Sequence, residues 1–164
     1  MKSNKFHLGC AALAAMALVA CSDDKMPTNT SLSEQNETLV RRLFEEGLNT
    51  GNLALISEML ASDFTLHNAP PNLPPGAEGF KALIGAFRSA FPDYKDTIED
   101  MIIEGDKVIV RWTFRGTHQG EFLGVPATNK LATTNGISIL RITAGKIKDD
   151  WTNIDMLGLL QQLR

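Results

Sequence analysis

Cysteine is scarce in this chain of 164 residues, which contains only Cys10 and Cys21. Cys10 lies in an N-terminal segment that we expect to be removed, so the mature protein would keep one thiol and no internal disulfide. The sequence also lacks a GxSxG motif, a glycine-rich phosphate loop and a reactive-cysteine motif. These absences argue against the usual hydrolases, nucleotide-dependent enzymes and thiol enzymes.

Basic residues are also fewer than acidic residues. The chain has 16 Lys and Arg residues against 19 Asp and Glu residues, and removal of residues 1–20 takes away Lys2 and Lys5, which leaves 14 against 19, a net charge of −5. A protein that binds nucleic acid needs a basic surface to neutralise phosphates. The composition therefore argues against a nucleic-acid partner.

Histidine is rare as well, with three in the chain. Only His67 and His118 lie outside the N-terminal segment, and the sequence has no HExxH or CxxC spacing. A zinc site would need both histidines and a carboxylate. We therefore predict no metal site and no cofactor.

The apolar run at the N-terminus is too short to span a bilayer as a mature helix. It covers the 13 residues from Leu8 to Ala20 and follows Lys2 and Lys5, a pattern typical of a signal peptide. The run ends in Leu18-Val19-Ala20-Cys21, which resembles the bacterial lipobox. An ordinary secretory signal with an incidental cysteine is the alternative.

The resemblance to a lipobox implies a membrane anchor. In such motifs the cysteine is acylated and the residues before it are removed, and several acyl chains on one residue hold a protein stably at a membrane. We expect residues 1–20 to be a lipoprotein signal peptide. We expect residues 21–33 to comprise the lipidated Cys21 and a flexible tether, and residues 34–164 to form the folded domain.

The residues after the cysteine bear on the destination of the protein. By the same resemblance, Ser22 fits a lipoprotein of the bacterial cell envelope that reaches the outer membrane and faces the periplasm. Asp23 and Asp24 leave the final leaflet open.

The remainder of the chain is long enough for one domain and, with 43% hydrophobic residues in the whole sequence, has an ordinary globular composition. Apolar residues recur at helical spacing in segments 31–48, 52–60 and 80–87, which predicts three helices. The first two segments begin at a capping residue, Ser31 or Asn52. Alternating residues predict strands at 63–67, 94–104, 107–117, 130–143 and 146–154. This order indicates an α+β fold, in which three helices cover one strongly curved antiparallel sheet and enclose a cone-shaped cavity.

The strand predicted at residues 146–154 carries candidate site residues. Asp149, Trp151, Asn153 and, just beyond the strand, Asp155 alternate along the chain, so they are expected on one face. Two carboxylates beside an aromatic ring suit acid/base chemistry, because burial raises a carboxyl pKa toward neutrality. Asp155 has an alternative role as the cap of a C-terminal helix, since an apolar segment follows it.

The turn before this strand predicts which residues lie across from it. In a two-residue hairpin at Ala144-Gly145, Leu140 falls opposite Asp149 and Ser138 falls opposite Trp151. Ser138 would then join the polar face in a mixed lining of the kind that binding pockets have. Periodicity alone does not say which face is buried.

Three further candidates lie elsewhere in the chain. His118 follows the strand that contains Trp112, and His67 ends the first strand, immediately before a proline-rich loop at residues 69–76. A histidine at a strand end can exchange protons near neutral pH, but more often it has a structural role. Trp112, like Trp151, is more often a core residue than a substrate platform.

Short motifs follow one another between about Thr38 and Leu163: Pro74-Pro75-Gly76-Ala77-Glu78-Gly79, Ala90-Phe91-Pro92-Asp93, Glu104-Gly105-Asp106-Lys107-Val108, Gly116-Thr117-His118-Gln119-Gly120 and Trp151 with Asp155. Their order and spacing resemble the SnoaL-like polyketide cyclase family, also called ester cyclases. The resemblance implies the nuclear transport factor 2-like fold, an α+β cone. It also implies an intramolecular aldol condensation that closes a ring without metal or cofactor.

The resemblance further implies roles for individual residues. Asp155 matches the aspartate of the family's Trp-x-x-x-Asp motif and is the expected proton-transfer group, with Asp149 as the alternative. His118 matches the histidine of its Gly-Thr-His motif and is expected to hydrogen-bond a developing enolate oxygen. His67 and the proline-rich loop are expected to close a pocket for a small, largely apolar carbonyl compound.

Two other functions fit the same residues. One is a non-catalytic protein that holds a lipophilic molecule at the envelope, and the other is a module that forms a homodimer through Ile137, Ile139 and Ile154 on an outer sheet face. Polyketide rings are closed in the cytoplasm, whereas this chain carries an export signal. The fold therefore transfers from the family more readily than the substrate does.

Overall fold

In the computed structural model of the chain, the described residues are 31–164. The expected signal peptide and Cys21 lie outside them. The helical elements are α1 (Leu32–Arg42), its π-helical continuation η1 (Leu43–Leu48), α2 (Leu53–Met59), α3 (Gly76–Ala90) and α4 (Met156–Leu163). The strands are β1 (Leu60–Leu66), β2 (Lys95–Glu104), β3 (Lys107–Thr117), β4 (Leu131–Thr143) and β5 (Lys146–Ile154).

The first two helices begin at the predicted caps. Ser31 Oγ accepts the N–H of Glu34 while the Glu34 carboxylate accepts the N–H of Ser31, which forms a capping box. Asn52 Oδ1 accepts the N–H of Leu55 at the start of α2. Because α1 begins at Leu32, the last residues of the expected tether belong to the first helix.

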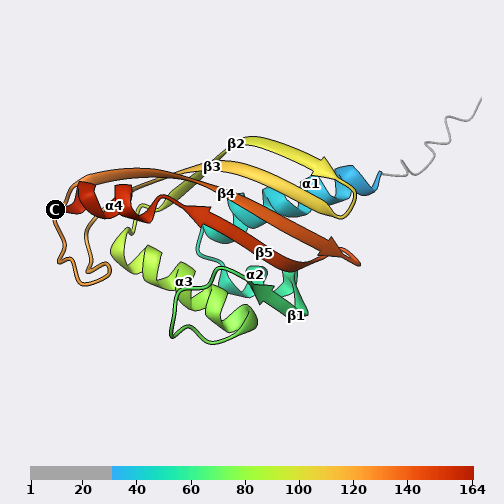
Figure 1. Ribbon diagram of the computed structural model, residues 1–164, viewed down its shortest axis with the longest axis horizontal. Helices are drawn as coiled ribbons and strands as arrows, with labels where there is room; N and C mark the ends of the chain where they lie inside the picture. Colours follow the sequence, from blue (N-terminus) through green and yellow to red (C-terminus); the bar gives the residue numbers. More distant parts are fainter. Residues whose placement is uncertain (1–30) are drawn as a thin grey trace, which may run out of the picture.

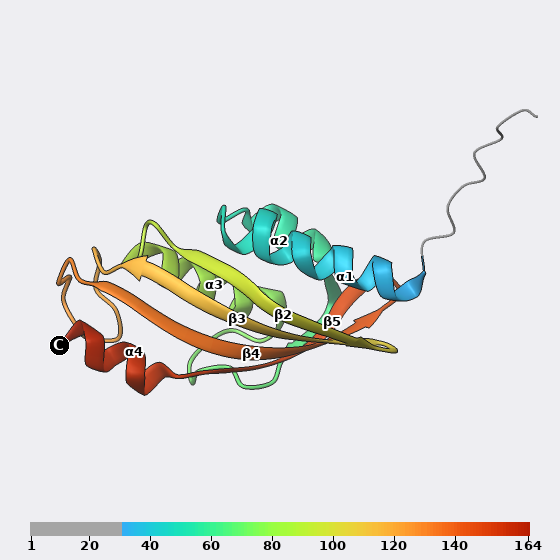
Figure 2. The same cartoon turned by 90° about the horizontal axis from the view of Figure 1, so that it is seen from above.

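The sheet has the strand order β1-β5-β4-β3-β2 and curves strongly (Figure 1). Strands β2 to β5 pair antiparallel, as expected, but β1 pairs parallel with β5, so the sheet is mixed. Helices α1, α2 and α3 lie on one side of it (Figure 2). A fourth helix, α4, follows β5. The expected α+β fold is confirmed. Within residues 31–164, no helix has both the length and the apolar character needed to cross a membrane.

Burial alternates along the central strands and defines an inner and an outer sheet face. In β4 the buried residues are Ala132, Thr134, Gly136, Ser138, Leu140 and Ile142, and in β3 they include Val108, Val110, Trp112 and Phe114. These side chains face the helices and form the core. On the outer face, the side chains of Ile137 and Ile139 are 48% and 37% exposed.

The hairpin between β4 and β5 has the predicted turn. Thr143 pairs with Lys146. Ala144 and Gly145 both have positive φ, 49° and 71°, which is the conformation of a two-residue type I′ turn and explains why a glycine stands there.

Beyond the turn, the predicted pairing of Leu140 with Asp149 is wrong. The register shifts so that Asp149 pairs with Arg141 and Asp150 pairs with Leu140, which makes Lys148 an extra residue in β5. Such a bulge bends the strand, and a one-residue shift moves every following side chain to the other face. Asp150 therefore lies opposite Leu140 on the inner face, at the position that the predicted pairing gave to Asp149.

A second bulge lies in β2. Asp100 pairs with Arg111, whereas Ile98 pairs with Trp112, so Glu99 is the extra residue. Beyond it, Asp96 lies opposite Phe114 on the inner face. The two bulges thus each turn one aspartate toward the helices.

Replacement of Asp155 with alanine should lower the free energy of unfolding by about 1 kcal/mol. The reason is that Asp155 Oδ1 accepts the N–H of Gly158, 2.8 Å away, and so caps α4. Asparagine also supplies an acceptor, so Asp155→Asn should remain close to wild type. Urea unfolding of the three proteins checks this, and equal stability of the alanine and asparagine variants would contradict the capping role.

Candidate active site

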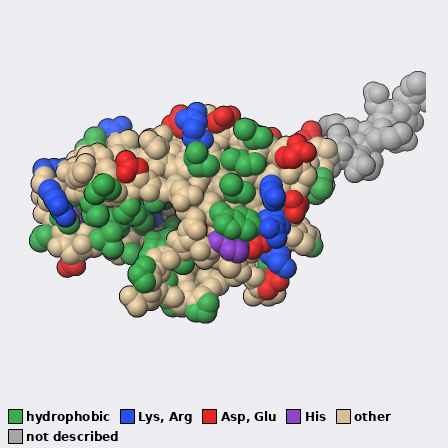
Figure 3. Space-filling view, in the orientation of Figure 1, with side chains coloured by type: hydrophobic (Ala, Val, Ile, Leu, Met, Phe, Trp, Pro, Cys, Tyr) green, Lys and Arg blue, Asp and Glu red, His purple; other side chains and the backbone are tan. Residues whose placement is uncertain are grey.

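A cavity of about 130 Å³ lies between the inner sheet face and the helices. Its lining is mainly apolar and aromatic and includes Leu43, Phe44, Phe80, Leu83, Phe87, Trp112, Phe114 and Leu140. The polar residues in the lining are Asn68, Tyr94, Asp96, Ser138, Asp150 and Thr152. Hydrophobic side chains gather around a hollow between α3 and α4 on the surface (Figure 3). Mixed linings with a few polar groups are typical of sites for small molecules.

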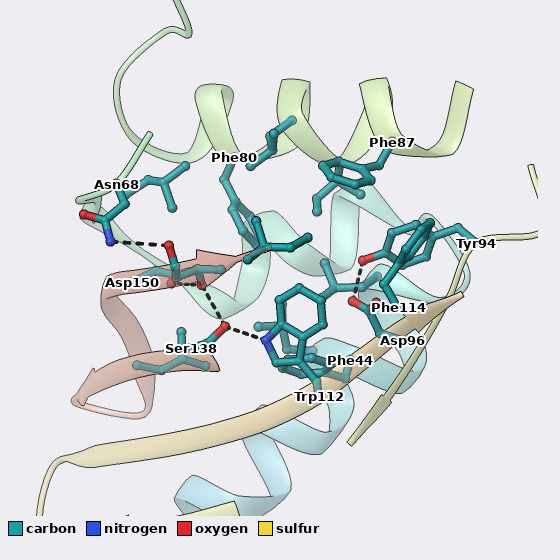
Figure 4. Close-up of a pocket in the computed structure, with 18 of the residues that line it drawn as sticks. Phe44, Asn68, Phe80, Phe87, Tyr94, Asp96, Trp112, Phe114, Ser138 and Asp150 are labelled. Atoms are coloured by element: carbon teal, nitrogen blue, oxygen red, sulfur yellow. Dashed lines mark hydrogen bonds between the residues drawn. The ribbon is translucent and has the colours of Figure 1, made fainter. Parts of the chain in front are cut away.

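Asp150 stands at the end of a chain of hydrogen bonds (Figure 4). The Trp112 indole donates to Ser138 Oγ at 3.0 Å, Ser138 and Thr152 share a hydrogen bond of 2.7 Å, and Thr152 Oγ1 donates to Asp150 Oδ1 at 2.6 Å. Since Thr152 uses its proton on Asp150, the Ser138 hydroxyl must donate to Thr152. Every donor in the chain therefore points toward the carboxylate, which fixes its orientation.

The surroundings of Asp150 change its acidity. Its residue surface is 4% exposed, and burial raises the pKa of its carboxyl to about 6, while the hydrogen bond from Thr152 and the nearby His67 oppose the increase. A carboxyl with such a pKa is mostly ionised at neutral pH and still binds a proton readily. Asp150 can therefore act as a base and then as an acid.

A second carboxyl, Asp96, lines another part of the cavity. The Tyr94 hydroxyl donates to its Oδ2, and its backbone N–H donates to Asn49 Oδ1 at 2.7 Å. Burial raises the pKa of Asp96 to about 7, against smaller lowering effects of the Tyr94 hydrogen bond and of Lys95. About half of the Asp96 side chains are therefore protonated near neutral pH.

Trp112 lies across the floor of the cavity because the facing strand has no side chain there. Gly136 pairs with Trp112, and a Cβ at Gly136 would lie 2.3 Å from the indole ring. The glycine thus allows the ring to lie flat enough for its N–H to reach Ser138. Trp112 and Ser138, both predicted for the pocket, are in its lining.

The remaining predicted site residues lie outside the cavity lining. Asp155, the predicted proton-transfer group, is exposed and is not in the cavity lining, and its carboxylate caps α4, which is the alternative role that the sequence offered. His118 is completely buried beside Phe91, and its Nδ1 lies 3.1 Å from Thr128 Oγ1. It therefore holds the loop between β3 and β4 and is not placed to bind an enolate in the cavity.

Four residues form a cluster on the outer sheet face, which we call the outer cluster: His67, Arg141, Asp149 and Trp151. Asp149 Oδ1 lies 2.7 Å from His67 Nε2, and its Oδ2 lies 3.3 Å from Arg141. The His67 ring stacks on Trp151 with centroids 4.2 Å apart, and the Arg141 guanidinium lies 5.1 Å from the Trp151 ring. His67, Asp149 and Trp151 were expected in the pocket, and the bulge at Lys148 explains why β5 presents Asp149 and Trp151 outward instead.

The outer cluster has a structural effect on the cavity. His67 directly follows β1, and its backbone N–H donates to Asp150 O. The next residue, Asn68, lines the cavity and donates to Thr152 O. Stacking and ion pairing on the outer face thus secure the start of the proline-rich loop at the rim. Ile154 was expected on the outer sheet face with Ile137 and Ile139, but it lines the cavity. Of the three isoleucines of the predicted dimer surface, only Ile137 and Ile139 are therefore exposed on the outer face.

No group of three or more His, Cys, Asp or Glu side chains in residues 31–164 is arranged to hold a metal ion. Asp96 and Asp150, the two carboxyls of the lining, lie on opposite sides of Trp112 (Figure 4). Both carboxyls therefore border the same mainly apolar enclosure, where a buried carboxyl can transfer protons.

Comparison with known proteins identifies the family. The model of the SnoaL-like polyketide cyclase family matches residues 38–163. The chain belongs to this family. Similar SnoaL-like proteins include the aklanonic acid methyl ester cyclase DauD of Streptomyces sp. (strain C5), 32% identical over 131 residues that cover 76% of this chain and 79% of DauD.

Two further relatives agree with this assignment. The nogalonic acid methyl ester cyclase of Streptomyces nogalater is 30% identical over 123 residues, which cover 70% of this chain and 87% of that cyclase. The solved structure of TsrD from Streptomyces laurentii has a TM-score of 0.72 and 30% identity, and the match covers 79% of this chain and 94% of TsrD. The expected SnoaL-like family and its α+β cone are therefore confirmed.

Sequence reasoning missed both carboxyls of this SnoaL-like cavity. A regular hairpin from the turn at Gly105 would place Asp96 opposite Arg115 on the outer face, and the bulge at Glu99 reverses this. The alternation of Tyr94, Asp96 and Ile98 was the available signal, because an acid between two apolar residues of the same parity is expected to share their buried face. No comparable signal distinguishes Asp150 from its neighbour.

The cavity acids should make the protein less stable as the pH rises from about 4 to about 7. An unfolded aspartate has a pKa of about 3.9, and Asp96 has a pKa of about 7 in the folded protein. Between these values the folded protein keeps a proton that the unfolded chain has lost, so the free energy of unfolding falls with increasing pH. Asp96→Asn does not titrate and should become more stable relative to wild type over this range. Urea unfolding across the pH series tests this, and a constant difference would contradict it.

Gly136→Ala should displace the Trp112 ring and lower the free energy of unfolding by about 1–3 kcal/mol. The added methyl meets the Trp112 ring, which is only 7% exposed. Gly85→Ala is the matched control, because a Cβ there meets nothing within 4 Å and alanine favours the helix. Thermal unfolding and tryptophan fluorescence compare the two variants. A Gly136→Ala protein as stable as the control would show that the ring has room.

Proposed function

We propose that this SnoaL-like protein is an acid/base enzyme that cyclises or isomerises a small, largely apolar carbonyl compound without a cofactor, with Asp150 as the proton-transfer group. The observation that carries this proposal is a carboxyl with a pKa of about 6, buried in an apolar cavity. Enzymes tune carboxyl groups to this range for proton transfer near neutral pH. The names of the relatives, which describe methyl ester cyclases, support ring closure as the reaction.

The proposed reaction begins when ionised Asp150 removes a proton from the carbon next to a carbonyl group. The electron pair of the broken C–H bond becomes an enolate. In a cyclisation, the enolate carbon forms a bond to a second carbonyl carbon of the same molecule, and the resulting alkoxide takes the proton back from Asp150. In an isomerisation, the proton returns to a different carbon. Atoms and charge balance in both cases, and no external reactant is needed.

The protein would assist these steps in two ways. The chain from Trp112 through Ser138 and Thr152 holds the Asp150 carboxylate in one orientation, which lowers the cost of reaching the reactive geometry. The aromatic walls exclude water, so that charge in the cavity interacts with fixed protein groups rather than with solvent.

The size of the cavity favours a compact substrate. Its volume of about 130 Å³ is close to the roughly 150 Å³ that accommodates benzene, and below the range of about 300–1,000 Å³ typical of pockets for larger ligands. We therefore infer a substrate about the size of one substituted ring. A larger one would require the loop that carries Asn68 and Pro70 to move.

Two parts of the proposal concern the setting of the enzyme. We propose that Cys21 is lipidated and anchors the domain at the bacterial envelope, facing the periplasm, an inference that rests on the N-terminal sequence alone. We also propose a homodimer formed through the outer sheet face, for which the exposure of Ile137 and Ile139 is the supporting observation.

A non-catalytic binding protein is the second candidate function, and the largely apolar lining favours it. Native mass spectrometry of the full-length protein, isolated from its own envelope, addresses this candidate. A small molecule that co-purifies unchanged and is not consumed on incubation would support storage. A protein that is folded but empty would argue against it.

The catalytic proposal is tested by deuterium exchange into the methyl group of acetophenone in heavy water, followed by NMR with purified full-length protein. Wild type should accelerate exchange, and Asp150→Asn should reduce the protein-dependent rate by about 10²–10⁴-fold, because the amide does not accept the proton. Asp155→Asn is the control and should keep the wild-type rate. If chemical shifts show that acetophenone occupies the cavity and Asp150→Asn exchanges as fast as wild type, Asp150 is not the base.

A further inference from the structure

We propose that Asp96 and Tyr94 form a second polar subsite at the end of the cavity away from Asp150, where the Asp96 carboxyl donates a hydrogen bond to an acceptor oxygen of the ligand. The inference rests on the proposed function in taking the ligand to be a carbonyl compound. It adds a specificity requirement: the ligand carries an oxygen acceptor at one end and the reacting C–H bond at the other.

One carboxyl oxygen of Asp96 has no hydrogen-bond partner among the described residues. Asp96 is 4% exposed and lines the cavity. Its Oδ2 accepts the hydroxyl proton of Tyr94, whereas its Oδ1 is buried and has no hydrogen-bond partner among residues 31–164. A buried polar atom without a partner is costly in a folded protein. A ligand oxygen in the cavity would provide the missing partner.

The protonation of this group makes it a donor rather than an acceptor. Burial raises the pKa of Asp96 to about 7 and also raises the pKa of Tyr94, so Tyr94 keeps its proton and donates it to Oδ2. A proton on Asp96 then resides on Oδ1, the oxygen without a partner. The charged groups that bear on this pair are Lys95 on β2 and Arg88 of α3, 5.8 Å from the Tyr94 ring, while Asn49 beside the Asp96 backbone is neutral.

The arrangement of the two carboxyls defines the ligand. Figure 4 shows Asp150 and Asp96 on opposite sides of Trp112, with Phe80 and Phe87 of α3 across the space between them. An apolar body fits between these rings. An oxygen at the Asp96 end can accept its proton, and a C–H bond at the other end lies toward Asp150. If the oxygen is conjugated with the reacting carbon, the same hydrogen bond stabilises the enolate as it forms.

The experiment uses acetophenone labelled with ¹³C at the carbonyl as the probe and measures its infrared stretching band in complex with full-length protein. Because its carbonyl and methyl groups lie at the same end of the ring, one bound molecule reaches one carboxyl at a time. The band therefore reports the molecules bound at Asp96, and deuterium exchange reports those bound at Asp150. A hydrogen bond to the carbonyl lowers the stretching frequency. Wild type should give a lowered band below about pH 7 that fades at higher pH, because ionised Asp96 no longer donates. Asp96→Asn should keep a lowered band at all pH values, since its amide N–H₂ can replace the donor and its oxygen can accept from Tyr94.

Asp96→Val removes the donor with little change in volume. It should abolish the lowered band and weaken acetophenone binding about tenfold, while the affinity for cumene, which has a similar shape but no oxygen, stays the same or increases. The Asn variant retains hydrogen bonding and guards against a folding defect of the Val variant. A band that is unshifted in wild type, or equally shifted in wild type and Asp96→Val, overturns the subsite, as does an absence of acetophenone binding.

Asp150→Asn separates this inference from the proposed function. It should remove deuterium exchange and leave the Asp96-dependent band in place. If wild type shows the Asp96-dependent band but catalyses no exchange, the proposed function fails and the subsite stands. If the band depends on Asp150 and not on Asp96, the carbonyl lies at the other end of the cavity and the subsite is wrong.

Discussion

The position of the cavity carboxyls depends on two β-bulges. Each bulge adds one residue, Glu99 in β2 and Lys148 in β5, and each reverses the alternation of side chains beyond it. The reversal brings Asp96 and Asp150 to the inner face and directs Asp149 outward. The same insertions bend their strands, so the curvature that creates the cavity and the placement of its acids have a common origin.

The apolar cavity and its buried acids are physically coupled. The aromatic walls that exclude water also raise the carboxyl pKa values, because burial penalises the charged form. The hydrogen bond from Thr152 limits this effect at Asp150, and that from Tyr94 limits it at Asp96. The site therefore contains one acid that is mostly ionised and one that is about half protonated near neutral pH, within a single enclosure. Pairs of carboxyls with different pKa values are suited to different roles in proton transfer.

Local signals in the sequence were sufficient for most of the fold. The caps at Ser31 and Asn52, the turn at Ala144-Gly145 and the alternation in β3 all depend on neighbouring residues, and the structure has each of them. The parallel pairing of β1 with β5 and the two bulges depend on contacts between distant segments, which periodicity does not encode. Asp155 illustrates the difference: its capping role followed from the adjacent apolar segment, whereas its proposed catalytic role required a register that Lys148 interrupts.

The bulge in β5 also bears on how such a site can change during evolution. Asp149 and Asp150 are adjacent acids, and their different environments result from one additional backbone unit rather than from their own chemistry. If Lys148 instead paired regularly with Arg141, Asp149 would lie opposite Leu140 on the inner face and Asp150 would lie opposite Ile139 on the outer face. A change in the pairing register of this strand would therefore move a different acid into the cavity without any amino-acid replacement.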